Sequence, residues 1–112
     1  MEKFDLIFLE SAFGFLDQLN VESRYKVFYN IWKSKKTNDP ELFRKLSFEI
    51  WEFRTQHLAQ QIRLLAFWDK SQSIVNITHG FVKKTQKTPR KEILKACNIR
   101  QAYYNDKELN KI

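Results

Sequence analysis

The spacing of hydrophobic residues in the first part of the chain predicts a strand followed by two helices. The run from Phe4 to Leu9 is mostly apolar and fits an opening strand, and a short helix is expected to follow and end near Leu19. Asn20 is a favourable N-cap for a second helix. In that helix four bulky residues recur at spacings of four, three and four: Val21, Tyr25, Phe28 and Trp32. We expect this aromatic stripe to pack on a sheet.

The next segment breaks the helical pattern. The sequence Thr37-Asn38-Asp39-Pro40 is typical of a chain break, and the lysines just before it suit the C-terminal end of a helix. Beyond the break, the apolar residues Leu42, Phe43 and Leu46 predict a single anchored helical turn.

From Ile50 the period of the pattern changes to two, which is typical of strands. Glu52 and Arg54 alternate with apolar residues and are expected to be neighbours on one face of the first strand. Two more strand-like runs, Gln61 to Trp68 and Ser73 to Phe81, are joined by a four-residue turn. The three runs predict an antiparallel meander. The turn between the first two, Gln56 to Gln60, contains no glycine, so the geometry of that hairpin stays open.

A helix is expected to close the chain. Thr88 is a credible N-cap, with Pro89 at the first helical position. Ile93, Cys97 and Tyr104 then fall on one face, and fraying is expected after Asp106. The fold class predicted for residues 1–112 is therefore a single α+β domain, with N-terminal helices packed on a small antiparallel sheet and a C-terminal helix.

The apolar runs, the N-terminal charges and the cysteine count indicate where in the cell the protein acts. The longest unbroken apolar run, Leu64 to Trp68, is far shorter than the ~20 residues needed to span a bilayer. Acidic residues at the N-terminus are not typical of a signal peptide. The one cysteine, Cys97, cannot form an internal disulfide. We therefore expect a cytoplasmic protein with no membrane partner.

Positive charge is concentrated near the end of the chain. Residues 81–112 contain nine Lys and Arg against three acidic residues, so that they carry +6 of the total net charge of +7. Such an asymmetry indicates a surface that meets phosphates, and nucleic acid is the first candidate partner. The alternative is a solvated cationic tail without a ligand.

Three motifs carry a resemblance to a known family: IWEFR from Ile50, QQIRLLAFWD from Gln61, and THGFVKKTQKTP from Thr78. Together with the order of elements, they resemble the RelE/HigB toxins, in particular the phage-derived HigB-like branch of the RelE/ParE superfamily. The resemblance implies a RelE-like fold and the toxin role in a bacterial type II toxin–antitoxin system. It further implies a ribosome-dependent endoribonuclease, or mRNA interferase, which inhibits growth. The implied partners are a cognate antitoxin of the helix-turn-helix, HigA-like kind, messenger RNA, and the ribosome with its RNA.

RNA can be cut without a metal if its own 2′-hydroxyl attacks the adjacent phosphorus. His57, His79 and Cys97 are scattered and no carboxylates cluster, so a zinc or two-metal nuclease is disfavoured and no cofactor is expected. Arg63, on the strand that resembles the catalytic strand of the family, and Arg54 are the candidates for a bidentate grip on the scissile phosphate. The alternative is that Arg54 pairs only with Glu52, or that either arginine lies on a solvated face.

Proton transfer has several candidates. A like charge nearby disfavours the protonated form of a lysine, so Lys83 or Lys84 could exchange a proton near neutral pH. Adjacent strand residues point to opposite faces, so only one of them is expected in the site unless the strand has ended, and Lys84 is slightly preferred. His79 is the alternative, because its ordinary pKa lies near 6.5. The remaining RNA-binding candidates are Lys87, Arg90 and Lys91.

The sequence leaves open the role of Glu52 and the kind of activity. Glu52 stands where RelE-type toxins carry lysine, and it could orient Arg54, carry a proton or point away from the site. The functional alternatives to an endoribonuclease are a non-enzymatic, ParE-like poison of DNA gyrase and an inactive remnant that only binds RNA.

Overall fold

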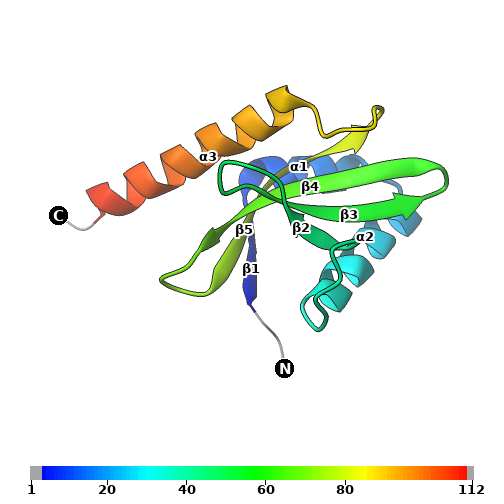
Figure 1. Cartoon of the computed structure of the whole chain (residues 1–112), viewed down its shortest axis with the longest axis horizontal. Coiled ribbons are helices and arrows are strands. Elements are labelled where there is room, and N and C mark those ends of the chain that lie inside the picture. Colours follow the sequence, from blue (N-terminus) through cyan, green and yellow to red (C-terminus); the bar gives the residue numbers. More distant parts are fainter. Residues whose placement is uncertain (1–3, 111–112) are drawn as a thin grey trace.

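The computed structural model describes residues 4–110 as a five-stranded sheet with helices on both faces (Figure 1). The elements in chain order are β1 (Asp5–Phe8), α1 (Glu10–Gln18), α2 (Val21–Ser34), β2 (Phe43–Lys45), β3 (Trp51–His57), β4 (Gln60–Asp69), β5 (Ile74–Lys83) and α3 (Arg90–Leu109). The strand order is β1-β5-β4-β3-β2. The predicted α+β class and the meander of β3, β4 and β5 are confirmed. The sheet is mixed, however, because β1 pairs in parallel with β5 while the other strands are antiparallel.

Each face of the sheet has its own core. Helices α1 and α2, blue to cyan in Figure 1, lie on one face, where Leu16 and Ile31 pack with Leu64. Helix α3, orange to red, lies across the other face and packs on a second cluster that includes Leu65 and Phe67. Within residues 4–110, no helix combines the length and apolar content that crossing a bilayer requires. The strands β3 to β5 thus have apolar clusters on both faces.

The prediction for the buried face of α2 was wrong. Tyr25 is 75% exposed and Trp32 is 50% exposed, whereas Val27 and Ile31 are fully buried. Val27 and Ile31 are also spaced by four and therefore form a second helical stripe. These smaller side chains, with Ser23 and Ser34, let the helix approach the sheet closely. The aromatic stripe consequently faces outward.

Two local predictions also need correction. Residues 43–45 form strand β2 rather than a helical turn, because Phe43 pairs with Phe53 on β3 and stacks on it with ring centroids 4.1 Å apart. Helix α3 begins at Arg90 with Pro89 in the N-cap position and continues past Asp106 to Leu109. The hydroxyl of Thr88 does not cap the helix but donates a hydrogen bond to Glu52.

The hairpin between β3 and β4 closes without glycine. Leu58 and Ala59 both adopt positive φ, at 51° and 64°, and His57 pairs with Gln60 across them. Two consecutive residues of positive φ are the pattern of a type I′ turn, whose twist matches that of the flanking strands. This turn fixes the register that sets Arg54 opposite Arg63.

Candidate functional site

Polar side chains of the three central strands gather at one end of the face that α3 partly covers. Arg54 on β3 pairs with Arg63 on β4, and Gln61, two residues before Arg63, pairs with Lys83 on β5. Side chains alternate along a strand, so paired residues and residues two apart share a face. The two arginines and Lys83 therefore point to the same side of the sheet.

These side chains line an open cleft of about 590 Å³. Its wall is made by the ends of β3, β4 and β5 and by the segment that leads toward α3; the lining residues are Arg54, Gln56, Gln61, Arg63, Lys83, Lys84, Thr85 and Gln86. Four of these carry positive charge and none is acidic. The cleft is therefore suited to an anionic ligand.

Arg63 forms the floor of the cleft and is only 2% exposed. Its Nη1 donates to the carbonyl of Ile62 at 3.1 Å and its Nη2 donates to the side-chain oxygen of Gln61 at 2.9 Å. A guanidinium has five N–H donors, so these contacts leave donors for a ligand. Burial and the neighbouring arginines lower the pKa of Arg63 from its usual value, and Glu52 opposes that shift.

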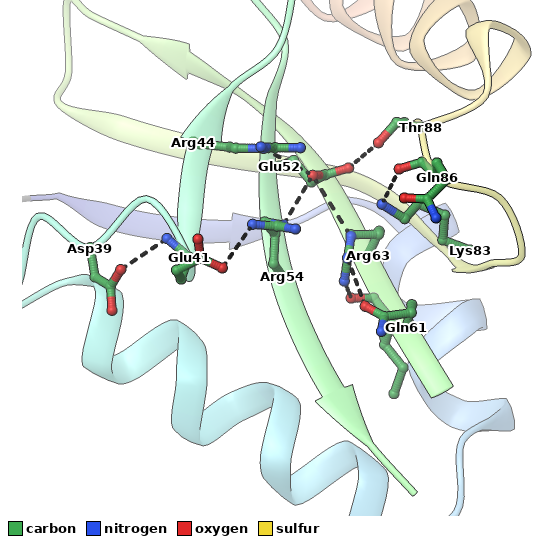
Figure 2. Close-up of polar contacts among 11 residues, drawn as sticks. Asp39, Glu41, Arg44, Glu52, Arg54, Gln61, Arg63, Lys83, Gln86 and Thr88 are labelled. Carbon is green, nitrogen blue, oxygen red and sulfur yellow. Dashed lines mark hydrogen bonds and ion pairs between the residues drawn. The ribbon is translucent and has the colours of Figure 1, made fainter. Parts of the chain in front are cut away.

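Glu52 lies beneath the cleft at the centre of the polar contacts in Figure 2. Its side chain is fully buried. One carboxylate oxygen, Oε1, lies 3.6 Å from Nε of Arg44, 3.6 Å from Nε of Arg54 and 3.7 Å from Nε of Arg63. The other oxygen accepts the hydrogen bond from Thr88. Of the roles left open by the sequence, orientation of Arg54 is the one that these contacts support.

Lys83 reaches the cleft from the end of β5. Its ammonium group donates to the carbonyl of Gln86 at 3.0 Å, and the residue is 9% exposed. Burial and the positive charge of Arg63 are the largest causes that lower the pKa of Lys83 from its ordinary value. Lys84 follows the strand end and is exposed on the rim. Both lysines thus line the cleft, and Lys83 is the more buried of the two.

The structure separates the other candidates from the cleft. His79 is buried beneath α3, where its ring nitrogens contact Thr78 Oγ1 and Glu92 Oε1, each at 3.0 Å. Burial lowers the pKa of His79, and Lys95 adds to this while Glu92 opposes it. Lys87, Arg90 and Lys91 are exposed on the segment that enters α3 and do not line the cleft. Across residues 4–110, no three His, Cys, Asp or Glu side chains come together as a metal-binding group.

Sequence reasoning missed several residues of the site. Gln56 lies two positions after Arg54 in β3, so the alternation recognised in that strand could have placed it on the cleft face. Gln61 lies two positions before Arg63 in β4, where the same period applies. Arg44 had no such signal, because its segment was predicted to be helical.

The fold and the cleft together define a small basic protein whose site is suited to a phosphate group. The chain belongs to the family described as "Phage derived protein Gp49-like (DUF891)", which matches residues 14–101. Its fold is similar to a chain in the crystal structure of the intact E. coli RelBE toxin–antitoxin complex, with a TM-score of 0.57 and 14% sequence identity over 73% of this chain and 99% of that chain. No curated protein sequence matches the chain significantly. The structural match confirms the RelE-like fold that the motifs indicated.

Proposed function

We propose that this chain is the toxin of a toxin–antitoxin pair and that it cuts messenger RNA on the ribosome as an endoribonuclease. The observation that carries the proposal is the set of three cations, Arg54, Arg63 and Lys83, that converge on one cleft from three adjacent strands. The family match and the RelE-like fold support the toxin role.

The cleft offers the groups that RNA cleavage by the 2′-hydroxyl requires. A base removes the 2′-hydroxyl proton, the 2′-oxygen bonds to phosphorus, and the bond from phosphorus to the 5′-oxygen breaks as an acid supplies a proton to that oxygen. The products are a 2′,3′-cyclic phosphate and a free 5′-hydroxyl. Arg54 and Arg63 stabilise the negative charge that grows on the phosphoryl oxygens in the transition state.

Lys83 is the leading candidate for proton transfer. A general acid or base works best when its pKa is near the working pH, and the pKa of Lys83 is lowered in that direction. Lys84 on the rim is placed to contact a neighbouring phosphate. His79 has no role in this scheme, because Glu92 and Thr78 engage both of its ring nitrogens.

The cations beyond the cleft extend the surface for nucleic acid. Lys87, Arg90 and Lys91 follow the cleft in the chain and are exposed. They would contact messenger or ribosomal RNA through phosphates, which makes affinity fall steeply with salt. A HigA-like helix-turn-helix antitoxin in the cytoplasm would silence the protein.

The first experiment is induced expression in bacteria, followed by mapping of the 5′ ends of total RNA. The wild type is compared with Arg63→Ala and with Lys70→Ala, which removes an exposed cation at the far end of β4. We expect growth arrest and cuts inside translated messages for the wild type and Lys70→Ala, but not for Arg63→Ala. Arrest with intact messages would refute the nuclease and favour the gyrase poison. RNA binding without arrest or cuts would favour the inactive remnant.

A further inference from the structure

The reaction scheme gives no role to the buried carboxylate of Glu52. We propose that Glu52 is a positioning residue that sets the arginine pair of the cleft and links it to the segment before α3. This inference rests on the proposed function, since it concerns how the same cleft is held ready for a phosphate.

Three guanidinium groups lie around the carboxylate of Glu52. Arg44, Arg54 and Arg63 come from β2, β3 and β4, and each turns its Nε toward one oxygen of Glu52. These contacts are ion pairs rather than hydrogen bonds, so the carboxylate holds the guanidinium groups near it by charge and leaves Nη donors for a ligand. One carboxylate thereby orients both arginines of the cleft (Figure 2).

Glu52 also supplies negative charge among the cations of the cleft. Arg63 is almost fully buried and has two further cations, Arg54 and Lys83, beside it. A buried charge needs a partner, and like charges at short range repel. Glu52 is the acidic residue that opposes the shifts in pKa of both Arg63 and Lys83 most strongly. Without it the cations of the cleft would move apart.

The other oxygen of Glu52 contacts the segment that leads into α3. It accepts from Thr88, which lies in the segment between Lys83 and the start of α3. Lys83 itself is bonded to Gln86 in that segment. The Glu52–Thr88 contact therefore ties the wall that carries Lys83 to the floor that carries Arg63.

A general base would need a carboxylate oxygen open to the substrate. Glu52 does not line the cleft, and its two oxygens face Thr88 and the three arginines. The geometry therefore supports a positioning role for Glu52 and not a role in proton transfer.

The decisive variant is Glu52→Gln, which keeps the shape and removes the charge. Removing a negative charge beneath a phosphate site should leave binding of RNA equal or tighter. Misplacing the arginines by about 1 Å should still slow cleavage about 10²-fold. The rate is measured as single-turnover cleavage of ribosome-bound message. The affinity is measured with an oligonucleotide that carries a 2′-deoxy residue at the scissile position. We expect the rate to fall and the affinity to be equal or higher. Unchanged cleavage would overturn the proposal.

The matched control is Glu41→Gln. Glu41 contacts Arg54 at 3.3 Å, but its side chain is 82% exposed. An exposed ion pair contributes little, so its loss should slow cleavage by no more than about threefold. An equal loss in both variants would overturn the special role of the buried carboxylate.

The pH profile supplies a readout that a purely structural role would not move. Burial and the charges of Arg63, Arg54 and Arg44 lower the pKa of Lys83, and the charge of Glu52 opposes that shift. In Glu52→Gln the limb of the rate profile that reports Lys83 should move to lower pH. An unmoved limb in a folded variant would contradict the proposal.

The last measurement is independent of cleavage. In the wild type, buried Nε–H groups of Arg54 and Arg63 should exchange slowly with water by nuclear magnetic resonance. Faster exchange in Glu52→Gln supports positioning even if the wild type cuts no RNA, whereas identical exchange overturns it. If Glu52→Gln does not fold, Thr88→Val, which keeps the carboxylate charge but removes its hydrogen bond, is measured in the same way. An absence of cleavage by the wild type would instead refute the proposed function.

Discussion

The substitution Asp69→Asn is expected to loosen the second half of α3. Asp69 is 1% exposed at the end of β4 and accepts hydrogen bonds from Ser71 Oγ at 2.7 Å, Tyr103 Oη at 2.7 Å and Lys107 Nζ at 2.6 Å. Asparagine keeps one acceptor oxygen but turns an amide nitrogen toward two donors. Hydrogen bonds to a charged group contribute about 1.5 to 3 kcal/mol each. Because Lys107 is partly exposed, the expected loss of unfolding free energy is about 3 kcal/mol.

The assay is thermal and urea unfolding, combined with amide exchange along α3. A loss of this size should lower Tm by about 10 °C in a chain of this length. Exchange should be faster in the turns after Arg100 than in those near Ile93. Asp106→Asn, on an exposed position of the same helix, should change stability by less than about 0.5 kcal/mol.

The dependence of unfolding stability on pH provides the test that could refute the anchoring role of Asp69. Its hydrogen-bond donors hold the pKa of Asp69 far below the usual value, although burial alone would raise it. Such a group stabilises the fold above its unfolded pKa near 3.9, and the contribution is lost as pH falls below that value. The variant should therefore lack part of the acid sensitivity of the wild type between about pH 4 and pH 2. Equal Tm and equal acid sensitivity in both proteins would show that Asp69 does not anchor α3.

Three further outcomes follow from the packing and the cleft. Gly80→Ala should cost about 1 to 3 kcal/mol in urea unfolding, because the added Cβ would lie 2.3 Å from a ring carbon of Phe15; an unchanged midpoint would contradict the packing of α1 on β5. Lys83→Arg keeps the charge but cannot release a proton, so cleavage should fall about 10²-fold while binding of 2′-deoxy RNA is retained, and equal rates would exclude proton transfer by Lys83. Ile31→Ala should cost about 2 to 5 kcal/mol, whereas Tyr25→Ser, at a position that is 75% exposed, should cost less than about 1 kcal/mol; comparable losses would mean that the aromatic stripe is buried after all.

The central strands could be predicted because alternation specifies register strongly where a face is buried. A slip of one residue in β3 would move Arg54 into the apolar core, so the sequence pattern and the fold agree there. The basic cleft followed from the same alternation, which put Arg54 and Glu52 on one face. Neighbouring strands then brought Arg63 and Lys83 to it.

The errors have a physical reason as well. Helix α2 carries two apolar stripes of helical period, and the period alone does not show which of them faces the sheet. The burial of Glu52 depends on Thr88, which is distant in sequence, so no local pattern reports it. The parallel partner of β1 is more remote still, because Asp5 pairs with Ile74.

The parallel pairing of β1 with β5 has a consequence for synthesis of the protein. Strand β1 lies at the edge of the sheet, and its hydrogen-bonding neighbour is the last strand that leaves the ribosome. A chain that lacks β5 has no partner for β1 and no Lys83 for the cleft. Contacts this far apart in sequence form late and slowly. The complete sheet and the basic cleft are therefore expected to assemble only after β5 has been made, so a chain that stops before Ile74 should contain neither.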